Sequence, residues 1–176
     1  MLYSKTIRLR FVEPDDAEFI LGLRLDIRYN QYLSTTINDV NAQRNWIKEY
    51  KSREREGKEY YFIIERKIDE IPIGTVRLYD FIEQANSFCW GSWILNEDKT
   101  RFAAIESAML VYRFAFEEVQ FSRSHFDVRK ENKSVLSFHR KMGAKEMGED
   151  ELNVYFHYFP ESYREQKVKL KRFLIS

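Results

Sequence analysis

Three strand-like segments follow one another in the middle of the chain, and this succession limits the possible folds more than any other feature of the sequence. They read EYYFIIER, IPIGTVRLYDF and SFCWGSWIL, at residues 59–66, 71–81 and 87–95. All three are rich in β-branched and aromatic residues, and the breaks between them, which contain KIDE and EQAN, have the polarity and length of turns. We therefore expect a three-stranded antiparallel meander at the centre of the fold.

Helix-like segments flank this meander in the sequence. EPDDAEFILGLR begins with proline and acidic residues and continues with an apolar stripe, as a helix start should. Residues 38–57 and about 103–119 have helical apolar spacing, and NKSVLSFHRKMG has Gly143 as its C-cap. IRLRFV, SRSHFDV and one or two closing strands complete the order. This order predicts an α+β fold over residues 1–176, a single domain with three α/β/α layers around a mixed, mostly antiparallel sheet of six to seven strands.

The composition excludes several classes of protein. The chain has 176 residues, of which 44% are hydrophobic, enough for one core and too many for a disordered chain. The net charge of +1 argues against nucleic acid as a partner, and no apolar stretch suits a signal peptide or a membrane span. The single cysteine, Cys89, leaves no disulfide and no multi-cysteine metal site. We expect a cytoplasmic monomer or homodimer with no metal, membrane or nucleic-acid partner.

Three stretches of the sequence carry a resemblance to a known family. The first, IRLRFVEPDDAEFILGLR, is a strand followed by a helix that begins with proline and aspartate. The second, GSWILNEDKTRFAAIESAMLVYRFAFEEVQFSRSHFDV, combines a strand, a polar loop, a helix and another strand. The third, VRKENKSVLSFHRKMGAKEMGE, sets an asparagine before a helix that ends in lysine-x-glycine. Together they resemble the GNAT superfamily of N-acetyltransferases, in particular the branch of ribosomal-protein and amino-sugar acetyltransferases. The resemblance implies the GNAT fold and acetyl-CoA as the cosubstrate.

The loop EDKTRFAAIES lies where the resemblance places the pyrophosphate of acetyl-CoA. The family's loop reads Arg/Gln-x-x-Gly-x-Gly/Ala, and this chain has Phe102 where a glycine is expected. A helix N-terminus still offers free amides, here those from Arg101 to Glu106, and a partial positive charge. Taken alone, the loop fits a solvated connection as well. Within the resemblance, the residues that we expect to bind the pyrophosphate are Lys99, Thr100, Arg101, Phe102, Ala103 and Ala104.

Further site residues follow from the resemblance. GNAT proteins bind the pantetheine arm with backbone groups of a splayed strand, which corresponds here to Trp93, Ile94 and Leu95, residues that equally suit a core strand. Asn132 is expected to cap its helix or to bond the pantetheine arm. Many family members have a tyrosine that protonates the thiolate seven residues after this asparagine, where this chain has His139. Histidine can donate a proton near neutral pH, although on an apolar helix face it also fits a packed core residue.

The general base is the least defined part of the site. Glu83, after the second strand of the meander, and Glu106, in the first turn of the loop helix, are candidates by position. His125 and Asp127 lie two residues apart and therefore share one face of their strand. Each of the four also fits a surface or structural role, and a water molecule could relay the proton instead. The catalytic candidates that we retain are His139 and Glu83.

The acceptor is expected to be a small-molecule amine. RYNQYLSTT is rich in tyrosine, asparagine and hydroxyl groups, and aromatic rings and acids are added by Tyr79, Asp80, Phe81 and Glu83. Aromatic rings stack on sugars and nucleobases, and carboxylates bind ammonium groups, which favours an amino sugar, preferably a nucleotide-linked one, over a peptide. Two alternatives stay open. One is acetylation of a protein N-terminus, and the other is a non-catalytic CoA-binding protein, which Phe102 and the missing tyrosine favour. Gly91 predicts a bulge or a close backbone contact.

Overall fold

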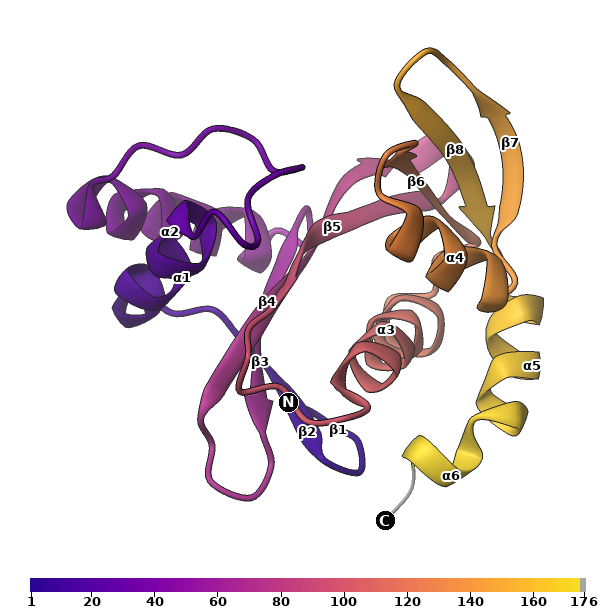
Figure 1. The fold of residues 1–176 in the computed structure, drawn as a ribbon, viewed down its shortest axis with the longest axis horizontal. Coiled ribbons are helices and arrows are strands. Elements are labelled where there is room, and N and C mark those ends of the chain that lie inside the picture. The colour runs from indigo at the N-terminus through magenta and orange to yellow at the C-terminus, as the bar shows by residue number, and fades with distance from the viewer. Residues whose placement is uncertain (175–176) are drawn as a thin grey trace.

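The structure, a computed structural model, describes residues 1–174 and contains an eight-stranded sheet with helices on both faces (Figure 1). The strand order is β1-β2-β3-β4-β5-β6-β8-β7, and the neighbouring pairs are antiparallel except β5 and β6, which are parallel. The strands are β1 (Leu2–Tyr3), β2 (Ile7–Phe11), β3 (Tyr60–Arg66), β4 (Pro72–Ile82), β5 (Ser87–Leu95), β6 (Arg123–Arg129), β7 (Lys145–Glu149) and β8 (Asn153–Tyr158). The helices are α1 (Ala17–Leu25), α2 (Val40–Arg55), α3 (Ala103–Arg113), which continues as a π-helical turn (Phe114–Glu118), α4 (Lys133–Lys141), α5 (Pro160–Lys169) and α6 (Lys171–Leu174).

The mixed, mostly antiparallel sheet that the sequence predicts is confirmed, including the meander β3-β4-β5. The strand beyond the predicted six to seven is β1, in which Leu2 and Tyr3 pair with Leu9 and Arg8 of β2. Two residues carry no alternation that a sequence pattern could reveal, which is why this strand escaped prediction. Helix α3 and its π-helical turn together match the helix that the sequence predicts over about 103–119.

Helices α1 and α2 cover one face of the sheet, and α3 with α5 lies on the other (Figure 1). Side chains of β3 alternate between these layers. Tyr61 and Ile63 join Tyr50 of α2 in one hydrophobic cluster, whereas Phe62 and Ile64 belong to the larger core on the α3 face. Both faces of β3 are therefore buried, which explains its continuous apolar run. The Tyr61 amide also donates to the Tyr50 hydroxyl at 2.7 Å, which fastens α2 to the sheet.

The parallel pair formed by β5 and β6 is very short. It consists of Ser87 opposite Arg123 and Phe88 opposite Ser124, after which the two strands separate. On its other edge, β5 stays paired with β4 as far as Leu95. β6 instead pairs along its length with β8, and α4 packs on it (Figure 1). The two central strands therefore diverge in the middle of the sheet.

A β-bulge interrupts β5 just beyond this divergence. The register with β4 shifts between Gly91 and Ile94, and Ser92 has a left-handed φ of 47°. Gly91 also permits a close contact, because a Cβ atom there would lie 2.9 Å from the hydroxyl oxygen of Tyr79. Of the two alternatives that the sequence indicates for Gly91, the bulge is confirmed, and the close contact there is with the side chain of Tyr79.

A substitution at Gly74 of β4 tests how closely β4 and β5 pack. A Cβ atom at Gly74 would lie 2.1 Å from the backbone oxygen of Ile94, so Gly74→Ala forces the two strands apart. We expect the free energy of unfolding to fall by about 3 kcal/mol in a denaturant titration, as for severe overpacking. The control is Gly22→Ala in α1, where nothing lies within 4 Å of the added Cβ atom. Loss of a helical glycine should stabilise that variant by about 0.5–1 kcal/mol, so equal stabilities would contradict the prediction.

Candidate active site

A cavity of about 400 Å³, called the first cavity below, lies where β5 and β6 diverge. Its walls come from these two strands, from α4 and from the loop after α1. Its lining includes Trp90, Gly91 and Trp93 of β5, Asp127 of β6, and Asn132 and His139 at α4. The cavity exists because a parallel pair that ends early leaves one edge of β5 without a neighbouring strand.

His139 is the buried polar group of the first cavity. It is 4% exposed, and aromatic rings surround it, with ring centroids at 5.4 Å for Trp90 and 4.4 Å for Phe126. Burial lowers the pKa of His139 to about 4, so the imidazole is neutral near pH 7. Its Nδ1 atom is buried and has no hydrogen-bond partner among the described residues. Unpaired buried polar atoms are rare in folded proteins, so Nδ1 is available to a water molecule or to a bound substrate.

Phe102 stands where the family pattern has a glycine, and its backbone angle and ring contacts show how the loop accommodates it. Phe102 precedes the helix with a φ of −113°, an ordinary negative value, so no glycine is required for the backbone geometry. Its ring packs against Phe173 of α6, with the ring centroids 4.5 Å apart. The guanidinium of Arg101 lies over the Phe102 ring at 5.3 Å. An aromatic contact with the C-terminal helix therefore holds this loop where the family pattern has a glycine.

Four amides at this helix N-terminus are free. The Ala103 amide donates to the Thr100 carbonyl oxygen at 3.1 Å, and the Glu106 amide donates to the Phe102 carbonyl oxygen at 2.9 Å. The other four amides between Arg101 and Glu106, those of Arg101, Phe102, Ala104 and Ile105, have no hydrogen-bond partner among the described residues. Unpaired N–H groups and the helix dipole together favour an anion at this position.

Glu106 has a structural role. Its carboxylate is fully buried and accepts hydrogen bonds from the Thr6 amide at 2.8 Å and from the Thr6 hydroxyl at 2.6 Å. The Thr6 hydroxyl also lies 2.6 Å from the hydroxyl of Thr100, which engages that side chain. These contacts tie the turn between β1 and β2 to the start of α3. Lys99 and Arg101 are exposed on the same loop, where their charge can reach a bound phosphate.

The strand positions predicted to bind pantetheine lie beside the first cavity. Trp93 lines it, and the indole donates to the Ser107 hydroxyl at 3.1 Å. Ile94 is buried, and Leu95 is partly buried against the core. Asn132 lines the cavity as well and caps α4, because its Oδ1 accepts a backbone amide of the first turn at 3.4 Å. The predicted capping role of Asn132 is thus present in the structure.

Glu83 lies away from the first cavity. It is exposed in the turn between β4 and β5, at the opposite end of β5 from the loop that precedes α3. His125 contacts the Ser87 hydroxyl at 2.5 Å and the Asp80 carboxylate at 3.2 Å, so both of its ring nitrogens are engaged. Asp127, on the same face of β6, lines the cavity. Among the carboxylates that the sequence suggested, Asp127 is the one that reaches the cavity wall.

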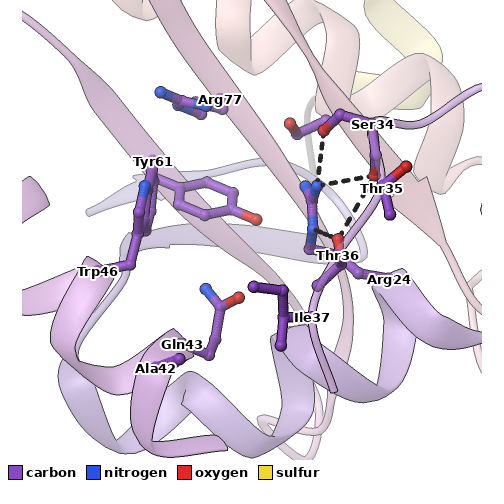
Figure 2. Close-up of a pocket in the computed structure, with 11 residues that line it drawn as sticks. Arg24, Ser34, Thr35, Thr36, Ile37, Ala42, Gln43, Trp46, Tyr61 and Arg77 are labelled. Atoms are coloured by element: carbon purple, nitrogen blue, oxygen red, sulfur yellow. Dashed lines mark hydrogen bonds between the residues drawn. The ribbon is translucent and has the colours of Figure 1, made fainter. Parts of the chain in front are cut away.

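A second cavity, of about 370 Å³, lies on the other face of the sheet, between α1, α2, the loop that joins them and strands β3 to β5. Figure 2 shows Arg24, Trp46, Tyr61 and Arg77 around it. The hydroxyl residues 34–36 of its wall belong to the RYNQYLSTT segment that the sequence predicts at the acceptor. The four residues seen in Figure 2 around the cavity come from α1, α2, β3 and β4, and no sequence pattern connects them.

The two cavities border the same segment of β5. Gly91 and Trp93 line the first cavity, whereas Ser92, between them, lines the second. Successive residues of a strand point to opposite faces, so the bulged segment is open to both sides. The other residues predicted near the acceptor line neither cavity, namely Tyr79, Asp80, Phe81 and Glu83.

A family model described as an acetyltransferase (GNAT) domain matches residues 6–145. The match includes every element that borders the second cavity, the loop before α3, and α4. The chain belongs to the GNAT acetyltransferase family. The resemblance drawn from the three sequence stretches is confirmed, and the protein is an N-acetyltransferase.

Relatives and solved structures agree with the GNAT assignment. The probable N-acetyltransferase YjcK of Bacillus subtilis (strain 168) is 31% identical over 160 residues, which cover 88% of each chain. Apo FdhC, described as a nucleotide-linked sugar GNAT, has a TM-score of 0.92 and 53% identity, over 98% of this chain and 97% of its own. Spermidine N-acetyltransferase from Vibrio cholerae, in complex with CoA and spermine, shares the fold, with a TM-score of 0.74 and 17% identity over 90% of this chain and 98% of its own. In the described part of the chain, no helix has the length and apolar character needed to cross a bilayer.

The buried neutral His139 makes the stability of this GNAT domain depend on pH. Its pKa falls from 6.5, the ordinary value, to about 4 in the fold. Below pH 6.5 the unfolded chain therefore binds a proton that the folded chain does not, and stability is lost progressively down to about pH 4. Between pH 7 and pH 4 we expect the wild type to lose about 3 kcal/mol more than His139→Phe in denaturant unfolding. Parallel pH profiles of the two proteins would contradict this.

Proposed function

We propose that the protein transfers an acetyl group from acetyl-CoA to the primary amine of a nucleotide-linked amino sugar, within a single domain over residues 1–176. The observation that carries the proposal is the pair of cavities that border the bulged segment around Ser92 from opposite faces. One cavity can hold the thioester while the other presents the amine to it. The 53% identity to FdhC, a nucleotide-linked sugar GNAT, supports this class of acceptor.

The pyrophosphate of acetyl-CoA fits the N-terminus of α3. The free amides supply hydrogen-bond donors, and the helix dipole adds a partial positive charge. The exposed side chains of Lys99 and Arg101 can add their full charges. Ala103 and Thr100 contribute through the shape of the loop, since the Ala103 amide and the Thr100 hydroxyl are already bonded.

The pantetheine arm fits along the edge of β5 that β6 leaves unpaired. Beyond Phe88 this edge has no neighbouring strand in the described chain, so its N–H and C=O groups can bond the amides of pantetheine. Trp93, Ile94 and Leu95 form this part of the strand, next to the pyrophosphate loop. The thioester then reaches the first cavity, which His139 lines.

Acetyl transfer requires an uncharged amine and a proton for the departing thiolate. The amine nitrogen attacks the thioester carbon, the C–N bond forms, and the C–S bond breaks. The proton that the nitrogen loses goes to the sulfur, so the products are an amide and free CoA. A neutral imidazole has one accepting and one donating nitrogen, so His139 can pass this proton from the nitrogen to the sulfur. Its pKa of about 4 favours this relay over donation from a resting imidazolium.

The two alternative functions, acetylation of a protein N-terminus and CoA binding without catalysis, receive less support. A protein N-terminus as acceptor calls for an open groove, whereas the second cavity is bounded by α1, α2 and the loop between them. A non-catalytic CoA-binding role rested on Phe102 and on the missing tyrosine. The Phe102 ring packs on Phe173 and its backbone φ is negative, and His139, which can carry a proton, stands where the tyrosine would be.

Acetyl-CoA binding and an acceptor panel test the proposal. Acetyl-CoA at 100 times its Kd should stabilise the protein by about 2.7 kcal/mol in a thermal-shift titration. Thiol release is then measured with nucleotide-linked amino sugars, free amino sugars, spermidine and N-terminal peptides. We expect the highest kcat/KM for the nucleotide-linked amino sugars. No stabilisation at millimolar acetyl-CoA would contradict acetyl-CoA as cosubstrate, and turnover of peptides alone would contradict the sugar acceptor.

The variant His139→Phe tests the proton relay. Phenylalanine keeps an aromatic ring among the rings that surround His139 but has no nitrogen to carry a proton. We expect kcat to fall by about 100-fold, a typical loss for a positioned acid or base, while the Kd for CoA in calorimetry stays the same. Phe138→Leu, the neighbouring ring on α4, is the control for disturbed packing. An unchanged kcat in His139→Phe would remove this residue from the mechanism.

A further inference from the structure

We propose that the second cavity binds the diphosphate of the acceptor, with Arg24 as the principal anion-binding residue. The proposal rests on transfer to a nucleotide-linked amine and names the chemistry that recognises it. The described lining of the cavity contains two guanidinium groups, from Arg24 and Arg77, together with hydroxyl groups, and no carboxylate. A concave wall with this charge attracts an anion.

The charge of Arg24 is not compensated by a neighbouring carboxylate. Its Nε donates to the Thr36 hydroxyl at 2.7 Å, and its Nη2 donates to the Ser34 hydroxyl at 2.9 Å (Figure 2). The partners of Arg24 in the described chain are thus neutral oxygens. These bonds fix the guanidinium plane at the cavity wall, and a fixed planar guanidinium suits the oxygens of a phosphate.

Arg77 and a second cation, Arg53, share a single carboxylate as their counter-ion. The Glu59 carboxylate pairs with both Arg77 and Arg53, so one negative charge faces two positive ones. Glu59 is 4% exposed and lies outside the cavity lining, whereas Arg77 is part of it. Arg77 therefore adds to the positive potential that Arg24 creates at the wall of the second cavity.

The positive charge of the second cavity distinguishes this chain from polyamine acetyltransferases. The Vibrio cholerae spermidine enzyme is shown with spermine, a polycation. A polycation needs carboxylates to compensate its ammonium groups, and the second cavity presents guanidinium groups instead. An acceptor that carries a diphosphate beside its amine matches the cavity, because the anion offsets the arginine charges and the amine remains free to approach Ser92.

A purely structural role for Arg24 leads to a different expectation. If its bonds to Ser34 and Thr36 served only to fix the loop, Arg24→Lys would disturb the cavity as much as Arg24→Gln, because both lose the guanidinium fork. If the charge binds phosphate, lysine retains part of the affinity and glutamine does not.

Titration with inorganic pyrophosphate and with UDP tests the site. The protein is first saturated with CoA, because the N-terminus of α3 would otherwise bind the same anions. We expect both probes to bind the wild type, about tenfold more weakly in Arg24→Gln, and with an intermediate loss in Arg24→Lys. Arg55→Gln, at the end of α2 and outside the cavity, should bind like the wild type. No binding to the CoA-saturated wild type, or equal losses in the two Arg24 variants, overturns the proposal.

Turnover distinguishes failure of this proposal from failure of the proposed function. With a nucleotide-linked amino sugar, Arg24→Gln should raise the acceptor KM about tenfold and leave the KM for acetyl-CoA unchanged. The free amino sugar should be a poor substrate for both proteins, with similar constants. Thiol release that is equally fast with the free sugar, or faster with spermidine, overturns the diphosphate site and leaves acetyl transfer intact. No thiol release with any amine contradicts the proposed function, and the pyrophosphate titration still decides the anion site.

Discussion

The early end of the β5–β6 ladder is the constraint on which the rest of the structure depends. β5 stays paired with β4 and β6 stays paired with β8, whereas β5 and β6 pair with each other no further than Phe88 and Ser124. Their divergence leaves a row of backbone groups without partners in the middle of a sheet, which costs free energy unless a ligand or water bonds them. The bulge at Ser92 falls on this same segment and opens it to the second cavity. A fold with a continuous ladder would have a stronger sheet and no site.

Burial divides the charged groups of the site by role. The buried Glu106 carboxylate is engaged by its hydrogen bonds from Thr6. His139 lies among aromatic rings, and its burial keeps the imidazole neutral. The groups that stay charged lie at the two ends of the site, with Lys99 and Arg101 by the α3 N-terminus and Arg24 in the second cavity. This distribution supports the proposed function, in which two anionic substrates meet at a neutral, aromatic centre. In that proposal the charged groups bind the substrates, and the reacting atoms lie among neutral groups.

Phe102 shows how a bulky residue fits at a loop position where the family pattern has a glycine. Glycine is required where φ is positive or where the ligand touches the Cα atom, and Phe102 has a negative φ. The bulk of its ring is accommodated by Phe173, so the C-terminal helix α6 becomes part of the loop's support. The family pattern alone could not reveal this, because the compensating ring lies far away in the sequence.

The sequence by itself determined the meander, the limits of α3 and α4, the capping residue Asn132 and the family, since each depends on local periodicity or on residues within one short stretch. It also pointed to His139 and to the loop before α3. The tertiary structure alone decided which of the candidate carboxylates reaches the first cavity, that Glu106 is a structural anchor, and that Arg24 and Arg77 share a second cavity. The physical reason is that the periodicity of apolar residues along the sequence determines the helices and strands. A site, in contrast, is built from contacts between helices and strands that are distant in the sequence. Those contacts follow from how the sheet diverges and how the helices pack, which no local pattern encodes.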